Sequence, residues 1–142
     1  MEKCIICDLD GTLSLFDKNI KNAYDRDFEN DEINEKVLFV LQSWSYFNPN
    51  GSIHFLSGRN DKFTDQTLEF LNKHLIGIPY NLVMRKNKDF RKDVIVKEEM
   101  YNNWIKDKYI VDFVIDDRLQ VCRLWYSLGL FVFNVNQGLI EF

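Results

Sequence analysis

Two aspartates, Asp8 and Asp10, lie directly after a short apolar run and before a glycine, in the segment 4–13 (CIICDLDGTL). An apolar strand that stops at this point would place both carboxylates at one end of the strand. Paired carboxylates with a free side suit a hard divalent cation, Mg²⁺ above all. They also suit a division of labour between a nucleophile and an acid or base. We predict Asp8 as the nucleophile and Asp10 as the acid–base residue.

The rest of the chain alternates between apolar runs typical of strands and stretches with helical periodicity. Strands are predicted over residues 3–8, 53–57, 80–84, 111–115 and 130–135. Helices are predicted over residues 31–47, 61–75, 89–105 and 117–128, and a polar segment covers 12–30. Continuous apolar strands that alternate with helices predict an α/β fold, in which a parallel sheet is covered on both faces.

Two further polar clusters follow the second and fourth predicted strands: Ser57, Gly58 and Arg59, and then Asp116, Asp117 and Arg118. Sites in parallel sheets lie at the carboxyl ends of the strands, where the strand order reverses. If these two strands flank the first one, all three polar clusters meet at one point. We expect Ser57 and the amides of Gly58 and Arg59 to bind a phosphate just before a helix. The guanidinium of Arg59 can bind it bidentately.

Four acidic residues are predicted on the metal side of this site: Asp8, Asp10 through its backbone carbonyl, Asp116, and Asp117 directly or through water. Without a cation, carboxylates crowded together would repel one another and raise each other's pKa values. Bound Mg²⁺ would remove this conflict and neutralise phosphate oxygens.

Lys97 lies four residues after Asp93, among the apolar residues of a predicted helix. One interpretation is an ordinary surface ion pair between neighbouring turns. The other is a catalytic lysine that Asp93 fixes and that points at the phosphoryl group, where it would screen repulsion between Asp8 and the phosphate. We predict Lys97 as catalytic and phosphate-binding, with Asp93 and Arg118 as supporting residues.

Length and composition predict one domain over residues 1–142, in which about 12–30 form a flap or small cap segment, since 46% of the residues are hydrophobic and can form a core. The formal net charge of −4 argues against bulk nucleic-acid binding. Basic residues do gather in one segment: Arg85, Lys86, Lys88, Arg91 and Lys92. This segment is either an ordinary solvated loop or a local landing patch for a phosphate backbone.

The cysteines and the lack of long apolar runs indicate a cytoplasmic protein. Three cysteines are a small and odd number, which argues for a reducing compartment. Cys4 and Cys7 lie three apart on a predicted strand, so they are expected to point to opposite faces and to be structural. No apolar run approaches the roughly 20 residues of a membrane span. The N-terminus does not resemble a secretory signal.

Four motifs in this order resemble those of the haloacid dehalogenase (HAD) phosphatase superfamily: residues 8–13 (DLDGTL), 57–59 (SGR), Lys97 and 115–117 (IDD). The resemblance implies a three-layer Rossmann-like fold with a parallel sheet in the order 5-4-1-2-3. It also implies Mg²⁺-dependent phosphoryl transfer through an aspartyl-phosphate. Only about 20 residues separate the first motif from the next helix, which implies a minimal cap and an open site that admits a polymer end.

A closer resemblance is to the 3'-phosphatase domain of bacteriophage polynucleotide kinase-phosphatase, which removes 3'-phosphates from nucleic-acid ends during repair. It is carried by residues 24–25, 33–34, 56–59, 91–99 and 115–121, with Trp125 and Gly129 after them. The resemblance implies Arg59 and Lys97 as phosphate contacts and Asp93 as an essential support. The kinase half of that family is missing, so 5'-phosphorylation is not expected. The flap arginine of the family cannot be placed within 16–23, where only Lys18 and Lys21 are basic.

We therefore predict a Mg²⁺-dependent phosphomonoesterase that acts on nucleic-acid 3' ends. One alternative is a phosphatase of nucleotides or small metabolites, which the acidic net charge mildly favours. The other is a noncatalytic HAD-like module that binds a partner or a phosphate, although such a module has no need for both acids of the first motif. Expected partners are a 3'-phosphorylated end or nucleotide, a second copy in a homodimer and a separate kinase or ligase, but no membrane.

Overall fold

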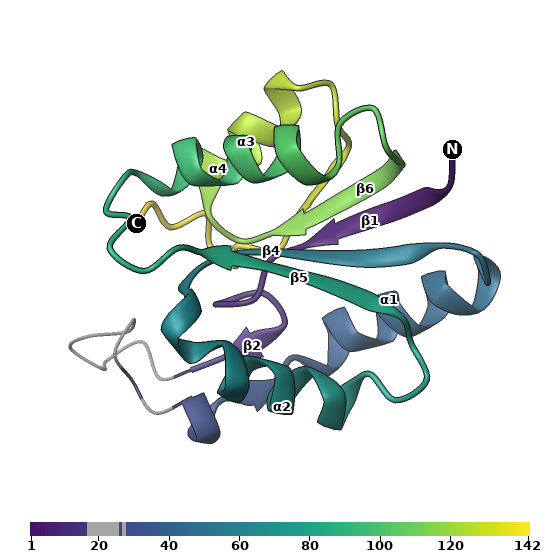
Figure 1. Cartoon of the computed structure of the whole chain (residues 1–142), viewed down its shortest axis with the longest axis horizontal. Helices are drawn as coiled ribbons and strands as arrows, with labels where there is room; N and C mark the ends of the chain where they lie inside the picture. Colours follow the sequence, from purple (N-terminus) through teal and green to yellow (C-terminus); the bar gives the residue numbers. More distant parts are fainter. Residues whose placement is uncertain (17–25, 27) are drawn as a thin grey trace.

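The computed structural model of the chain describes residues 1–16, 26 and 28–142, and a parallel sheet lies at its centre (Figure 1). The sheet strands are β1 (Lys3–Cys7), β4 (Ser52–Asn60), β5 (Tyr80–Arg85), β6 (Ile110–Asp116) and β7 (Val132–Asn134). The helices are α1 (Glu35–Phe47), α2 (Thr64–His74), α3 (Asp93–Trp104) and α4 (Leu119–Ser127). Shorter elements are β2 (Ser14–Leu15), β3 (Glu32–Ile33) and the 3-10 turns η2 (Phe28–Asn30) and η3 (Asp61–Phe63).

The strand order of the sheet is β5-β4-β1-β6-β7, and all four pairings are parallel. Numbered along the chain over these five strands alone and read from β7, the order is 5-4-1-2-3. The predicted order and the α/β class are therefore confirmed. The strand labels differ from that count because β2 and β3 pair with each other in a separate antiparallel ribbon.

Helices cover both faces of the sheet, so the protein has three layers (Figure 1). The side chains of β1 alternate between the two resulting cores, as the two-residue period of a strand requires. Ile5 and Cys7 pack in the core of α1 and α2, whereas Cys4 and Ile6 pack in the core of α3 and α4. Cys4 and Cys7 thus point to opposite faces, as predicted. Burial raises the pKa of the Cys4 thiol to about 12, which suits a structural role.

The first helix begins later than predicted. Residues 32–33 form β3 instead of the first helical turn, and Asn34 then caps α1 by accepting a hydrogen bond from the Lys36 N–H. The side chain of an asparagine in this position satisfies one of the amide N–H groups that the first helical turn leaves without a partner. The polar segment predicted over 12–30 contains β2 and η2, while residues 17–25 and 27 lie outside the described part of the chain.

The second strand is longer than predicted, and this corrects the setting of Ser57, Gly58 and Arg59. These residues belong to β4, because pairing with β5 continues as far as Asn60 opposite Arg85. They do not form the start of a helix, since η3 and α2 begin only after Asn60. The amides of Gly58 and Arg59 thus belong to the strand end that precedes the helical segment, and their predicted binding of a phosphate stays a prediction.

The topology brings the three polar clusters to one edge of the sheet, as expected. β1 lies between β4 and β6, so the order of the strands reverses at β1. Asp8 follows β1 directly, Asp116 is the last residue of β6, and Arg59 lies near the end of β4. Among the described residues, no helix combines the length and the apolar character that crossing a membrane would require.

Leu41 tests how far the α1 layer supports the fold. Its side chain is completely buried in the core of α1 and α2, whereas Phe39 on the same helix is 69% exposed. We expect Leu41→Ala to lower the free energy of unfolding by about 2–5 kcal/mol, because it leaves a cavity. Phe39→Ala should change it by less than about 0.5 kcal/mol. Urea unfolding followed by circular dichroism measures both, and equal midpoints would contradict the assigned packing.

Candidate active site

The Asp8 carboxylate lies at the end of β1, where it contacts Lys97 from helix α3. One of its oxygens, Oδ1, accepts a hydrogen bond from Lys97 Nζ at 2.8 Å. The Thr12 hydroxyl lies 3.0 Å from Asp8 Oδ2 and 3.1 Å from Asp117 Oδ1, so it can donate its hydrogen to either carboxylate. Asp8 is only 8% exposed, yet it lines the pocket described below. These contacts fix the carboxylate and leave one side of it accessible.

Asp116 is held on several sides by the chain itself. Its Oδ1 accepts hydrogen bonds from the amides of Asp117 (2.9 Å) and Arg118 (3.2 Å). Its Oδ2 accepts a hydrogen bond from Trp125 Nε1 at 3.1 Å and lies 3.6 Å from Lys97 Nζ. Trp125 is completely buried in the second core, so the packing of α4 fixes the orientation of this carboxylate.

One carboxylate oxygen from each of three residues, Asp8, Asp116 and Asp117, lies within 4.8 Å of the other two. Burial, together with the charges of Asp116 and Asp117, raises the pKa of Asp8 well above its usual value, although Lys97 opposes the shift. Burial and the charge of Asp116 likewise raise the pKa of Asp117. Crowded, buried carboxylates with hard oxygen atoms are the donor set that Mg²⁺ prefers. The three residues therefore fit a bound Mg²⁺ ion.

Lys97 is a buried cation that faces this acidic group. Burial alone would lower its pKa, but the charges of Asp116 and Asp8 raise it above the usual value. The lysine therefore stays charged. When all groups are ionised, the three carboxylates exceed this one ammonium by two negative charges, which a divalent cation would balance.

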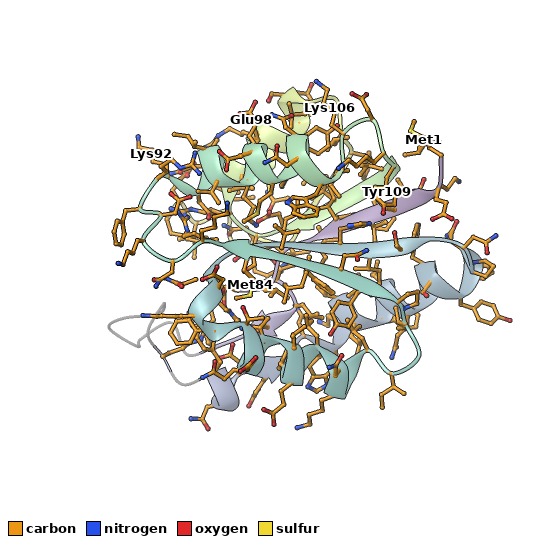
Figure 2. All side chains as sticks on the ribbon, in the orientation of Figure 1. Met1, Met84, Lys92, Glu98, Lys106 and Tyr109 are labelled. Atoms are coloured by element: carbon orange, nitrogen blue, oxygen red, sulfur yellow. The ribbon has the colours of Figure 1, made fainter. Side chains whose placement is uncertain are left out.

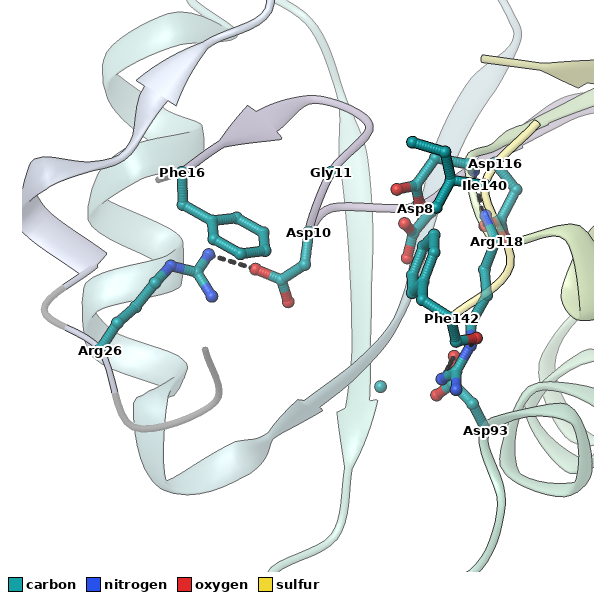
Figure 3. Close-up of a pocket in the computed structure, with 12 residues that line it drawn as sticks. Asp8, Asp10, Gly11, Phe16, Arg26, Asp93, Asp116, Arg118, Ile140 and Phe142 are labelled. Carbon is teal, nitrogen blue, oxygen red and sulfur yellow. Dashed lines mark hydrogen bonds and ion pairs between the residues drawn. The ribbon is translucent and has the colours of Figure 1, made fainter. Parts of the chain in front are cut away.

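Asp10 does not point its carboxylate at this group (Figure 3). Its Oδ1 accepts a hydrogen bond from Arg59 Nη2 at 2.7 Å and another from Arg26 Nη2. Burial alone would raise the pKa of Asp10, but Arg59 and Arg26 lower it below its usual value. The side chain of Asp10 is thus neutralised by two arginines and is not part of the acidic metal group. Its predicted metal contact, through the backbone carbonyl, stays a prediction.

Arg59 is 1% exposed and makes its contacts inside the protein. Besides Asp10, it donates from Nη1 to the Thr67 hydroxyl at 2.9 Å, and its guanidinium stacks 4.0 Å from the centre of the Phe28 ring. The hydroxyl of Ser57 accepts a hydrogen bond from the Arg59 amide at 3.0 Å. The structure thus places Arg59 as a positioning residue for Asp10, and direct phosphate contacts by Arg59 and Ser57 stay predictions.

The predicted pair between Asp93 and Lys97 is wrong. Asp93 forms ion pairs with Arg85 at 3.0 Å and with Arg118 at 3.6 Å. Lys97 forms its pairs with Asp8 and Asp116 instead. Four-residue spacing only places two side chains on one side of a helix. Here Asp93, in the first turn of α3, faces the neighbouring loops, while Lys97 reaches into the sheet edge.

Gly58 allows Asp93 to approach the end of β4. A Cβ atom added to Gly58 would lie 2.1 Å from Asp93 Oδ1, closer than real contacts allow. Gly11 has the same relation to Asp117, whose Oδ2 would lie 2.1 Å from an added Cβ, and its φ of +85° also favours glycine. Both glycines of the motifs are therefore required by side chains that the site brings against them.

Seven residues of the site had no role in the sequence analysis. Arg26 bonds Asp10 and Asp31, and Asp31 in turn accepts a hydrogen bond from the Ser14 hydroxyl. Arg26 directly follows residues 24–25, which are part of the family resemblance, and this position could have identified it as a site residue. Thr12 lies within the first motif itself. Three apolar side chains that no local signal indicated also reach the site: Phe16, shortly after the first motif, and Ile140 and Phe142, from a distant part of the sequence.

A pocket of about 350 Å³ opens beside these groups (Figure 3). The described residues that line it are Asp8, Asp10, Gly11, Phe16, Arg26, Gly58, Asp93, Asp116, Asp117, Arg118, Ile140 and Phe142. The lining thus combines carboxylates with three apolar side chains, Phe16 beside Arg26 and, across the pocket, Ile140 and Phe142 near Arg118 (Figure 3). Such a pocket can hold a phosphate ester with its phosphorus near Asp8 and its organic part against these apolar side chains.

Sequence comparison relates the chain to proteins that process nucleic-acid ends. A sequence model of the family described as polynucleotide kinase PNKP phosphatase domain matches residues 2–140. A protein of Autographa californica nuclear polyhedrosis virus, assigned as a bifunctional polynucleotide kinase/RNA ligase, is 33% identical over 141 residues. These residues are 99% of this chain but 20% of the viral protein.

Solved structures agree with the sequence comparison. A chain in the structure of the Pnkp1/Rnl/Hen1 RNA repair complex is 39% identical, with a TM-score of 0.86 over 96% of this chain and 43% of that one. The HAD domain of the effector protein Lem4 from Legionella pneumophila is 16% identical, with a TM-score of 0.56 over 99% of this chain and 88% of that domain. The latter likeness shows the HAD fold alone.

The chain thus spans a fifth of the viral relative and less than half of the chain in the repair complex. The match to the family nevertheless extends over almost its whole length and includes all four motifs. The resemblance inferred from these motifs is confirmed, and the chain belongs to the family of polynucleotide kinase PNKP phosphatase domains.

Proposed function

We propose that this protein removes 3'-phosphates from nucleic-acid ends in a Mg²⁺-dependent reaction that passes through an aspartyl-phosphate on Asp8. The observation that carries the proposal is the arrangement around Asp8. Its carboxylate opens on a pocket, is held by Lys97 at 2.8 Å and lies within 4.8 Å of two further carboxylates. A buried nucleophile with a fixed cation beside it meets the requirements of nucleophilic catalysis on a phosphate ester.

In the first step, a carboxylate oxygen of Asp8 attacks phosphorus and the bond from phosphorus to the 3' oxygen breaks. The leaving 3' oxygen takes a proton from the Asp10 carboxyl group, which enters this step protonated and leaves it as a carboxylate. Lys97 reduces the repulsion between the Asp8 carboxylate and the negative phosphate. Asp8, Asp116 and Asp117 would hold Mg²⁺, which when bound supplies positive charge that neutralises the transferring phosphoryl group.

In the second step, water attacks the phosphorus of the aspartyl-phosphate and gives a proton to Asp10. The bond between phosphorus and Asp8 breaks, which releases inorganic phosphate and restores the Asp8 carboxylate. Arg59 and Arg26 hold the Asp10 side chain in place and, because they lower its pKa, favour release of its proton to the leaving oxygen. After the two steps, Asp8 is again a free carboxylate and Asp10 again carries its proton.

The family membership supports a polynucleotide as the substrate, and the named relatives support a role in end repair. The viral relative is assigned as a kinase and ligase, and the other relative belongs to an RNA repair complex. We propose that this phosphatase works together with a kinase or ligase, either as a separate partner or within a larger assembly. The cytoplasmic location and the homodimer expected from the sequence are further parts of this proposal.

A comparison of substrates tests the proposed specificity. We expect a 3'-phosphorylated oligonucleotide to be hydrolysed with a kcat/KM at least about tenfold above that of a 5'-nucleoside monophosphate, a difference of about 1.4 kcal/mol in transition-state stabilisation. A 3'-nucleoside monophosphate should fall between the two. Release of inorganic phosphate measures all three. Preference for the 5'-nucleotide would replace the end-repair function with that of a nucleotide phosphatase.

Two asparagine variants separate the roles of the first-motif carboxylates. Asp8→Asn should abolish turnover of every substrate, because the nucleophile is gone. Asp10→Asn should slow hydrolysis of a 3'-phosphorylated oligonucleotide by about 10²–10⁴-fold. It should slow p-nitrophenyl phosphate much less, since nitrophenolate leaves without a proton. Asp65→Asn, on the exposed side of α2, is the matched control. Equal losses for both substrates would refute the acid role, and an active Asp8→Asn variant with an unchanged circular dichroism spectrum would refute the nucleophile.

Metal dependence is tested by both activity and stability. Treatment with EDTA should abolish turnover, and added Mg²⁺ should restore it. Mg²⁺ should also raise the thermal unfolding temperature, because it binds the folded site only. Asp117→Asn should raise the Mg²⁺ concentration for half of this stabilisation by about tenfold or more. Full activity after chelation, or an unfolding temperature of the unmodified protein that does not change with Mg²⁺, would exclude a Mg²⁺ ion at this site.

A further inference from the structure

A second hollow of about 460 Å³ adjoins the active-site pocket. It lies between η3 and the loop of residues 86–92, which connects β5 to α3. The two hollows share three lining residues, Gly58, Asp93 and Arg118. They therefore adjoin at the ion pair between Asp93 and Arg118, and a molecule longer than the pocket would pass this pair to enter the groove.

The groove is basic, although the chain as a whole carries a formal charge of −4. Five basic side chains line it, against two acidic ones, Asp89 and Asp93. The five are Lys62, Arg85, Arg91, Lys92 and Arg118. Three of these basic residues, Arg85, Arg91 and Lys92, belong to the basic segment that the sequence analysis identified.

The arginines of the groove are used to build it. Arg85 donates to the Gly58 carbonyl at 2.8 Å and pairs with Asp93, which joins the end of β4 to the start of α3. Arg91 pairs with Asp89 and Glu99. Lys92 differs from them, because it is exposed and its side chain makes no capping hydrogen bond at the start of α3. Its ammonium can therefore meet a phosphate without losing such a contact.

Phe90 lies on the wall of the same groove and is 91% exposed. Among the described aromatic rings, none is stacked on it. An exposed ring beside positive charges is the combination with which proteins bind single-stranded nucleic acids, since bases stack on the ring while phosphates meet the cations.

We propose that this groove binds the nucleotides that precede the terminal 3'-phosphate, with their phosphates at Lys62 and Lys92 and a base on Phe90. The inference rests on the proposed function, because it takes the pocket at Asp8 as the place of the terminal phosphate. The groove would then provide affinity for a polymer end over a mononucleotide. It would do so without base-specific contacts, since stacking and phosphate contacts tolerate any sequence.

Charge removal at the groove tests the proposal. The variant Lys62→Ala/Lys92→Ala is compared with Lys73→Ala/Lys106→Ala, which removes two exposed lysines elsewhere; Figure 2 shows Lys92 and Lys106 at opposite ends of α3. Each is assayed on a 3'-phosphorylated RNA decamer and on a 3'-nucleoside monophosphate. We expect the groove variant alone to raise KM for the decamer by about tenfold, with kcat and the mononucleotide unchanged. The slope of log affinity against log salt should fall by about 1 to 1.5.

Phe90→Ala should raise KM for the decamer by a similar factor of about ten, because a stacked base loses its platform. Phe39→Ala, an exposed phenylalanine of α1, is the control. Equal effects of groove and control variants, or equal effects on decamer and mononucleotide, would overturn the groove.

Binding separates a failure of the groove from a failure of the proposed activity. Fluorescence anisotropy of the labelled decamer with the Asp8→Asn protein needs no turnover. Weaker binding on removal of Lys62 and Lys92 supports the groove even if the unmodified protein hydrolyses none of the substrates, in which case the phosphatase function itself would be wrong. Unchanged binding would overturn the groove while leaving the phosphatase function intact.

Discussion

The site depends on one buried ammonium group, that of Lys97, between carboxylates from two strands. It lies 2.8 Å from Asp8 and 3.6 Å from Asp116, and it is 1% exposed. Burial and the charge of Asp116 already raise the pKa values of Asp8 and Asp117, and without this cation nothing from Lys97 would oppose these shifts. Removing one partner of such a buried pair generally costs about 3–5 kcal/mol, because the other charge stays buried and uncompensated. The lysine thus allows the carboxylates to be brought together before any metal binds.

A second charged cluster lies beside the first and is balanced in itself. Arg26 and Arg59 face Asp10 and Asp31, with hydrogen bonds between them and an aromatic ring, Phe28, against both guanidinium groups. Among the residues that the structure describes, the two positive and two negative groups of this cluster cancel, and they leave no excess charge for a metal to balance. The first cluster has an excess of two negative charges when ionised. This difference explains why the Asp10 side chain, only two residues from Asp8, is separate from the predicted metal side.

Two contacts at the site require the main chain to approach side chains unusually closely. Asp117 presses against Gly11 and Asp93 against Gly58, so that any side chain at either glycine would collide with a carboxylate. The fold achieves this approach by placing β1 between β4 and β6, which directs three strand ends to one edge. Trp125 then joins the edge to the core, since its indole fills the second core while its N–H holds Asp116.

The sequence by itself determined the α/β class, the strand order through the family motifs, and the acidic residues at the strand ends, because these follow from apolar runs and short local motifs. The helix start at Glu35 and the extent of β4 escaped it, since a cap and a strand pairing decided them. Only the tertiary structure decided which charges meet. Lys97 pairs with Asp8 across 89 positions, whereas Asp93, four positions away, pairs with Arg85 and Arg118. Helical spacing limits the direction of a side chain, but the partner that it reaches depends on what the packed layers place there.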